Sequence, residues 1–128
     1  MKIINGATGS LMTEFYAYAS TFTGGVYVTA GDMTGDGKAE LAVGSGIGRG
    51  EVKIFNSAGT QVRDYPIDDP RALQQGVRVG MADTDGDGKE DLLLAVGTDV
   101  QVRNPLTNAT KETMTPFDPT VLGGVFVG

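Results

Sequence analysis

The sequence contains no cysteine and no histidine among its 128 residues. Without cysteine the fold has no disulfide bonds, and no thiolate can act as a nucleophile or as a metal ligand. Without histidine the chain lacks the usual general base of enzymes and the most common zinc ligand. These two absences argue against thiol chemistry, histidine-based catalysis and the usual zinc sites.

Long apolar runs are also missing. No stretch approaches the ~20 apolar residues that a membrane-spanning helix needs. The first six residues, MKIING, have no apolar core of the kind that a secretion signal contains. We therefore expect a mature or recombinant form of the protein, or a protein that is not exported by that route.

The net negative charge is concentrated in two short segments, residues 32–40 and 83–91. The net charge of the chain is −6, and these segments account for all of it because the remainder is neutral overall. A neutral remainder argues against nucleic-acid binding, which needs a basic surface. It also gives no indication of electrostatic attachment to a membrane.

The chain repeats itself at a spacing of about 50 residues. GVYV at residues 25–28 corresponds to GVRV at 76–79 and to GVFV at 124–127. VKIFN at 52–56 corresponds to MKIIN at 1–5 and to VQVRN at 100–104. The twenty glycines of the chain are spread along it beside apolar runs, which favours tight turns between short strands over disorder.

Each repeat is predicted to form four short strands, which in the first full copy cover residues 26–30, 41–44, 52–56 and 62–67. Four strands in a repeat of this length are typical of a β-propeller blade, and a β-sandwich of hairpins is the alternative. We expect an all-β chain of about two and a half blades, with little helix, completed by other chains. The expected units are a half blade at 1–22, full blades at 23–73 and 74–122, and the first strand of a third at 123–128.

The second acidic segment has the donors of a calcium site. Asp83, Asp85 and Asp87 occupy alternate positions of a glycine-containing loop, Asp91 stands at its ninth position, and the Lys89 carbonyl is a further donor. Calcium binds six to eight oxygen atoms in flexible geometry, whereas magnesium prefers a strict octahedron and keeps its waters. The spacing is similar to that of an EF-hand, but the flanks are predicted strands and the glutamate at position 12 is missing.

The first acidic segment is a weaker version of the same loop. Its expected donors are Asp32, Thr34, Asp36, the Lys38 carbonyl and Glu40, so that threonine replaces one carboxylate. A metal-free turn is the alternative for both loops, because aspartate and glycine are natural turn residues. The prediction is two calcium ions, with the second site stronger.

Residues 22–37, FTGGVYVTAGDMTGDG, and residues 53–59, KIFNSAG, resemble FG-GAP/VCBS-type repeats. Such repeats form the propellers of integrin α-chains and occur in many bacterial secreted proteins. The resemblance covers nearly the whole chain. It implies a calcium-bearing β-propeller at the cell surface or outside the cell, with the ligands named above.

Two other patterns could carry chemistry. The glycine-rich residues 44–50 could be a phosphate loop, but they lack the lysine–serine ending and a following helix, so a flexible connection is favoured. Asp64, Asp68 and Asp69 could supply an acid/base pair for sugar chemistry, but a solvated loop is favoured. We therefore predict no enzymatic activity.

Three classes of function follow from these patterns. The first is a structural module that associates with other copies of itself into a ring or filament. The second is a calcium-stabilised adhesion module that binds a protein or glycan, as a fragment of a larger propeller. The third is a calcium-assisted polysaccharide-active enzyme, which has the least support. No partner beyond these is indicated.

Overall fold

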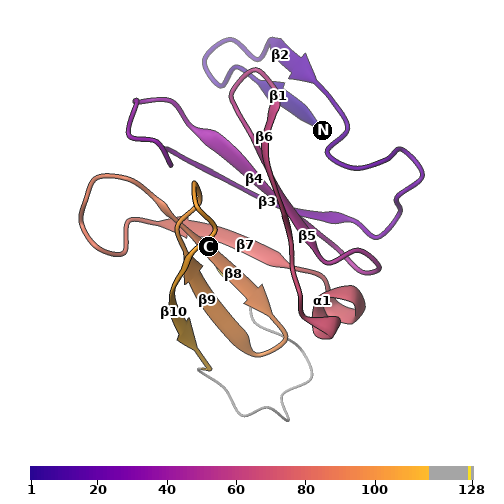
Figure 1. Ribbon diagram of the computed structural model, residues 1–128. Coiled ribbons are helices and arrows are strands. Elements are labelled where there is room, and N and C mark those ends of the chain that lie inside the picture. Colours follow the sequence, from indigo (N-terminus) through magenta and orange to yellow (C-terminus); the bar gives the residue numbers. More distant parts are fainter. Residues whose placement is uncertain (116–126, 128) are drawn as a thin grey trace.

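The computed structural model describes residues 1–115 and 127. Over these residues the fold consists of three antiparallel sheets and one short helix (Figure 1). The expectation of an all-β fold built from four-stranded antiparallel sheets is therefore confirmed. The strand expected at 123–128 lies outside the described residues apart from Val127.

The first four-stranded sheet contains β3 (Val26–Gly31), β4 (Glu40–Ser45), β5 (Glu51–Phe55) and β6 (Gln61–Pro66). Its strands are paired in chain order, so each is joined to the next as a hairpin. Each strand expected in this segment overlaps one of the observed strands. The β-branched and aromatic residues that alternate along these runs are the reason, because they pack well on a pleated surface.

The second four-stranded sheet repeats this order with β7 (Arg78–Ala82), β8 (Asp91–Val96), β9 (Asp99–Arg103) and β10 (Thr110–Met114). The remaining hairpin consists of β1 (Lys2–Ile4) and β2 (Leu11–Glu14). Figure 1 shows the three sheets following one another, with the hairpin on one side of the first four-stranded sheet and the second on its other side.

Three asparagines at equivalent places of the repeat begin the turns that follow β1, β5 and β9. The side-chain oxygen of Asn5 accepts the amide hydrogens of Ala7 and Thr8. Asn104 accepts the equivalent pair of hydrogen bonds, and Asn56 accepts amide hydrogens from the second and fourth residues after it. Such bonds stabilise a tight turn locally, so the recurrence in sequence corresponds to a recurrence in structure.

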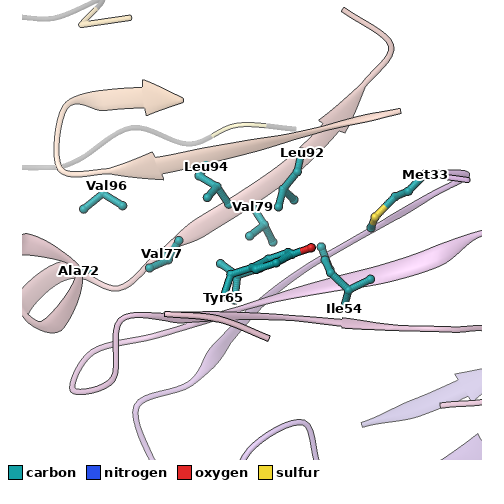
Figure 2. Close-up of a cluster of buried hydrophobic side chains, with 11 residues drawn as sticks. Met33, Ile54, Tyr65, Ala72, Val77, Val79, Leu92, Leu94 and Val96 are labelled. Atoms are coloured by element: carbon teal, nitrogen blue, oxygen red, sulfur yellow. The ribbon is translucent and has the colours of Figure 1, made fainter. Parts of the chain in front are cut away.

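The two four-stranded sheets pack face to face through buried apolar side chains (Figure 2). Ile54 and Tyr65 point from the first sheet towards Val79, Leu92 and Leu94 of the second. The Tyr65 hydroxyl donates a hydrogen bond to the Pro105 carbonyl, so its polar atom is satisfied within this interface. Burial of these side chains stabilises the sheet pair by about 25 cal/mol for each Å² of apolar surface removed from water.

Gly44 sets the distance between the two sheets where β4 meets β7. A Cβ atom at this position would lie 2.0 Å from the Val77 carbonyl oxygen and 3.0 Å from a methyl carbon of Val79. Both distances are shorter than van der Waals contact. The absence of a side chain at Gly44 therefore allows β7 to lie directly against β4.

The opposite face of the first sheet is partly covered by the segment that follows β2. Tyr18 is buried there with Val43 and Phe55, and the ring of Phe15 lies 4.7 Å from that of Phe55. The Tyr18 hydroxyl lies 2.8 Å from the Val43 carbonyl oxygen and 2.9 Å from that of Glu51. Burial raises the pKa of Tyr18 well above its usual value, and the nearby Glu51 carboxylate adds to this shift.

The expected solvated loop around Asp68 and Asp69 is wrong for Asp69. Residues Pro70–Gln75 form the helix α1, and the Asp69 side chain caps it by accepting the Arg71 amide hydrogen. The Arg71 guanidinium also binds the carboxylates of Asp69, at 2.7 Å, and Asp99, at 2.6 Å. These bonds hold the connection between the two four-stranded sheets and lower the pKa of the Asp69 carboxyl.

Candidate metal centres

The second acidic loop joins β7 to β8 at one end of the second four-stranded sheet. Because its flanking elements are strands and not helices, it is not an EF-hand. The Asp83 carboxylate organises the loop by accepting amide hydrogens from Gly86 at 2.7 Å, Asp87 at 3.2 Å and Gly88 at 3.0 Å. Gly86 and Gly88 have φ of +78° and +82°, values that favour glycine and turn the chain around the Asp83 carboxylate.

Three carboxylates meet in this loop. One oxygen each of Asp83, Asp85 and Asp87 lies within 4.8 Å of the other two, and all three side chains are exposed. Oxygens bound to one calcium ion at 2.3–2.6 Å lie at most about 5.2 Å apart, which is twice that distance. The separations of the three oxygens are therefore compatible with binding to a single calcium ion.

Asp91, the fourth expected carboxylate, has a cationic partner. It is buried, it accepts a hydrogen bond from the Thr84 hydroxyl, and one oxygen lies 2.6 Å from the Lys111 ammonium group. Lys111 comes from β10 and also lies 2.7 Å from an Asp85 oxygen. This ammonium lowers the pKa of Asp85 and has its own pKa raised in return.

The first acidic loop joins β3 to β4 and has the same backbone arrangement. The Asp32 carboxylate accepts amide hydrogens from Gly35 and Gly37, both at 2.7 Å, and from Asp36 at 3.2 Å. These bonds hold the pKa of Asp32 below its usual value, the Gly37 amide most of all. The Thr34 hydroxyl lies 3.4 Å from Asp32, so the two predicted donors are neighbours.

Glu40 closes this loop from the first residue of β4. It is buried, and it accepts the amide hydrogen of Met33 at 3.1 Å. Burial raises the pKa of Glu40. Within residues 1–115, the carboxylates of Asp32, Asp36 and Glu40 do not form a close group like that of the second loop.

The lysine at the seventh position of each loop donates a backbone hydrogen bond to an aspartate of the same loop. The amide of Lys38 donates to the Asp36 carboxylate and the amide of Lys89 to that of Asp87, both at 2.9 Å. The side chain of Lys89 extends over Gly35 of the first loop. The Glu90 amide donates a hydrogen bond to the Asp32 carbonyl at 3.0 Å. The two loops are thus in direct contact.

The other sequence candidates do not assemble into a site. Asp64 lies 3.9 Å from the Lys53 ammonium group, which also lies 3.7 Å from Glu51, whereas Asp69 binds Arg71, so Asp64 and Asp69 contact different cations. The glycine-rich residues 44–50 form the end of β4 and a turn packed on α1, where the Gly48 amide donates to the Leu73 carbonyl. The connection was expected to be flexible, but it is held by this bond.

A comparison with protein-family models matches residues 32–94 to the FG-GAP-like repeat. The matched segment begins at the first acidic loop, contains the second, and ends in β8. No curated protein and no solved structure matches the chain. Among the described residues, no helix is long and apolar enough to cross a membrane.

Proposed function

We propose that this chain, in which residues 32–94 are an FG-GAP-like repeat, is a calcium-binding structural module that acts outside the cell. The observation that carries the proposal is the convergence of the Asp83, Asp85 and Asp87 oxygens within 4.8 Å. Like charges this close repel one another, and a divalent cation is the simplest way to neutralise three of them. Each four-stranded sheet would then be a propeller blade with an ion at one end of its first hairpin.

The proposed ligands of the second ion are Asp83, Asp85, Asp87, the Lys89 carbonyl and Asp91. Those of the first are Asp32, Thr34, Asp36, the Lys38 carbonyl and Glu40. All are oxygen donors, which suits a hard cation, and their number suits calcium better than the strict octahedron of magnesium. The first site has fewer carboxylates, because Thr34 stands where the second loop has Asp85, so we expect it to bind more weakly.

A structural role is favoured over catalysis. Asp69 and Asp99 are held by Arg71. Asp64 shares Lys53 with Glu51, and burial together with the contact to Glu51 raises the pKa of the Asp64 carboxyl. A general acid needs a proton at neutral pH, and the Arg71 cation opposes protonation of Asp69 and Asp99, while Asp64 is exposed to solvent. We further propose that the module associates with other copies of itself, and an adhesion module with a protein or glycan ligand is the alternative.

Isothermal titration calorimetry with calcium tests the metal proposal. The parent chain is expected to bind two ions, and Asp87→Ala is expected to bind one, because it removes a carboxylate from the three-oxygen group. Asp68→Ala is the matched control, since it removes an exposed aspartate outside both loops and is expected to bind two ions. Absence of calcium binding by the parent chain at millimolar concentration would refute the proposal.

Lys111 is expected to compete with calcium for the second loop. Its ammonium group lies 2.7 Å from an Asp85 oxygen and 2.6 Å from an Asp91 oxygen, and both residues are proposed ligands. Lys111→Met should therefore raise the calcium affinity of this site severalfold in low salt. Lys2→Met is the control, because Lys2 lies 3.7 Å from Glu14 on another sheet. Equal dissociation constants for the parent chain and Lys111→Met would contradict this role.

A further inference from the structure

The face of the first four-stranded sheet that lies opposite the second sheet is only partly covered. Residues 15–22 cover Val43, which is fully buried. Val26 and Val28 on the neighbouring strand β3 are 45% and 47% exposed. They line an apolar hollow of about 260 Å³ whose other walls include Met1, Tyr16, Tyr18 and Phe22.

The internal repeat shows what normally covers this face. Val77 and Val79 correspond to Val26 and Val28 at a spacing of 51 residues, and they are 0% and 5% exposed. They are buried because the first sheet packs on them, with Tyr27 of β3 lying against the same cluster. The exposed valines thus belong to half of an interface that is complete elsewhere in the same molecule.

The chain also contains a segment with the residues that would complete it. GVFV at 124–127 corresponds to GVYV at 25–28, which places Phe126 at the position of Tyr27. The segment has no charged side chain, and neither do the residues that line the hollow. In the complete interface, the aromatic ring of Tyr27 on strand β3 packs against the cluster that contains Val77 and Val79. Phe126 could supply the corresponding ring.

We propose that the surface formed by Val26, Val28, Tyr16 and Phe22 binds residues 124–127 of a second copy of this chain, with Phe126 packed on Val26 and Val28. The proposal rests on the self-association proposed above and assigns it a surface and a partner segment. Repeated in one direction, the contact joins copies head to tail. Such heterologous contacts give a ring where the rotation closes, or a filament where it does not.

The absence of cysteine makes this contact testable by disulfide cross-linking. In the double variant Val28→Cys/Phe126→Cys, oxidation is expected to give dimers and larger species on a non-reducing gel, which a reductant returns to single chains. A disulfide forms only where the two Cα atoms approach to about 4.4–6.8 Å. Val62→Cys/Phe126→Cys is the matched control, because Val62 is a similarly exposed valine on β6, 40% exposed.

Mixing ¹⁵N-labelled and unlabelled double variant identifies the partner of each cysteine. Cross-linked peptides that join a labelled Val28 segment to an unlabelled Phe126 segment are expected. Peptides joined only within one chain, or cross-linking no greater than in the Val62 control, would overturn the proposal.

A second variant tests whether self-association uses this surface or another one. Val28→Glu places a charge on an exposed position, so the fold is expected to persist while the particle mass measured by light scattering falls. If the mass of the parent chain exceeds that of one chain and Val28→Glu leaves it unchanged, association uses another surface and the present inference is wrong. If the parent chain itself has the mass of one chain, the proposed self-association and this inference fail together, while calcium binding is still judged by calorimetry.

Discussion

Calcium is expected to raise the melting temperature of this protein by roughly 10–30 °C. An ion that binds only the folded state stabilises it by about 2.7 kcal/mol when its concentration is 100 times the dissociation constant. Two such sites would add about 5 kcal/mol, and in a chain of this size each kcal/mol moves the melting temperature by roughly 2–6 °C. Thermal unfolding followed by circular dichroism, in millimolar calcium and in EDTA, measures the difference.

Asp87→Ala is the control for this result. It should keep only the part of the increase that the first loop contributes, and its melting temperature in EDTA should be close to that of the parent chain. Magnesium at the same concentration should have a smaller effect, because it dehydrates reluctantly and needs a near-ideal octahedron. Identical melting of the parent chain in calcium and in EDTA would show that metal does not support the fold.

Gly44→Ala is expected to destabilise the protein by about 3 kcal/mol, the upper part of the range for overpacked interiors. The added carbon would lie 2.0 Å from the Val77 carbonyl oxygen, which belongs to the backbone and cannot rotate away as a side chain could. Relief therefore requires β7 to move from β4, which would open the apolar interface between the two sheets. Urea unfolding monitored by circular dichroism gives the change in the free energy of unfolding.

Gly6→Ala is the matched substitution, because nothing lies within 4 Å of a Cβ atom at Gly6 and its φ is not positive. We expect its free energy of unfolding to stay within about 0.5 kcal/mol of the parent value, as for most surface substitutions. Similar stabilities of the two variants would mean that the sheets can separate at Gly44 without loss, and that their close approach is not a source of stability.

The strands and the two acidic loops could be predicted from the sequence because both depend on local patterns. Alternating apolar residues identify a strand, and Asp83 with Gly86 and Gly88 identifies a tight turn wherever it is placed. The 51-residue spacing then relates one sheet to the next. Within the described residues, these features account for the order of the strands and for the position of each acidic loop.

The role of Lys111 could not be predicted, because it lies 20 residues after Asp91 in sequence. It reaches the second loop only because β10 ends the same sheet in which β7 and β8 hold the loop. Sequence spacing contains no such information.

The sequence contains signals for the ends of helix α1 that the sequence analysis did not use. Asp69 followed by Pro70 is a favourable helix start, and Gly76 is a favourable end. Six residues are too few to show a helical period, so the apolar pattern alone gave no indication of it. The buried position of Met33, which belongs to the first loop and packs into the interface between the sheets, likewise depends on the fold and not on the local sequence.

The Glu90 amide donates a hydrogen bond to the Asp32 carbonyl. Glu90 lies between Lys89 and Asp91, two proposed ligands in the second loop, and Asp32 is a proposed ligand in the first loop. An ion that orders one loop thereby restricts the backbone of the other loop. The ion that binds later then loses less conformational entropy in ordering its own loop. Calcium uptake should consequently be cooperative, with a titration steeper than that of two independent sites. The blades of such a protein would stiffen together over a narrow range of calcium concentration.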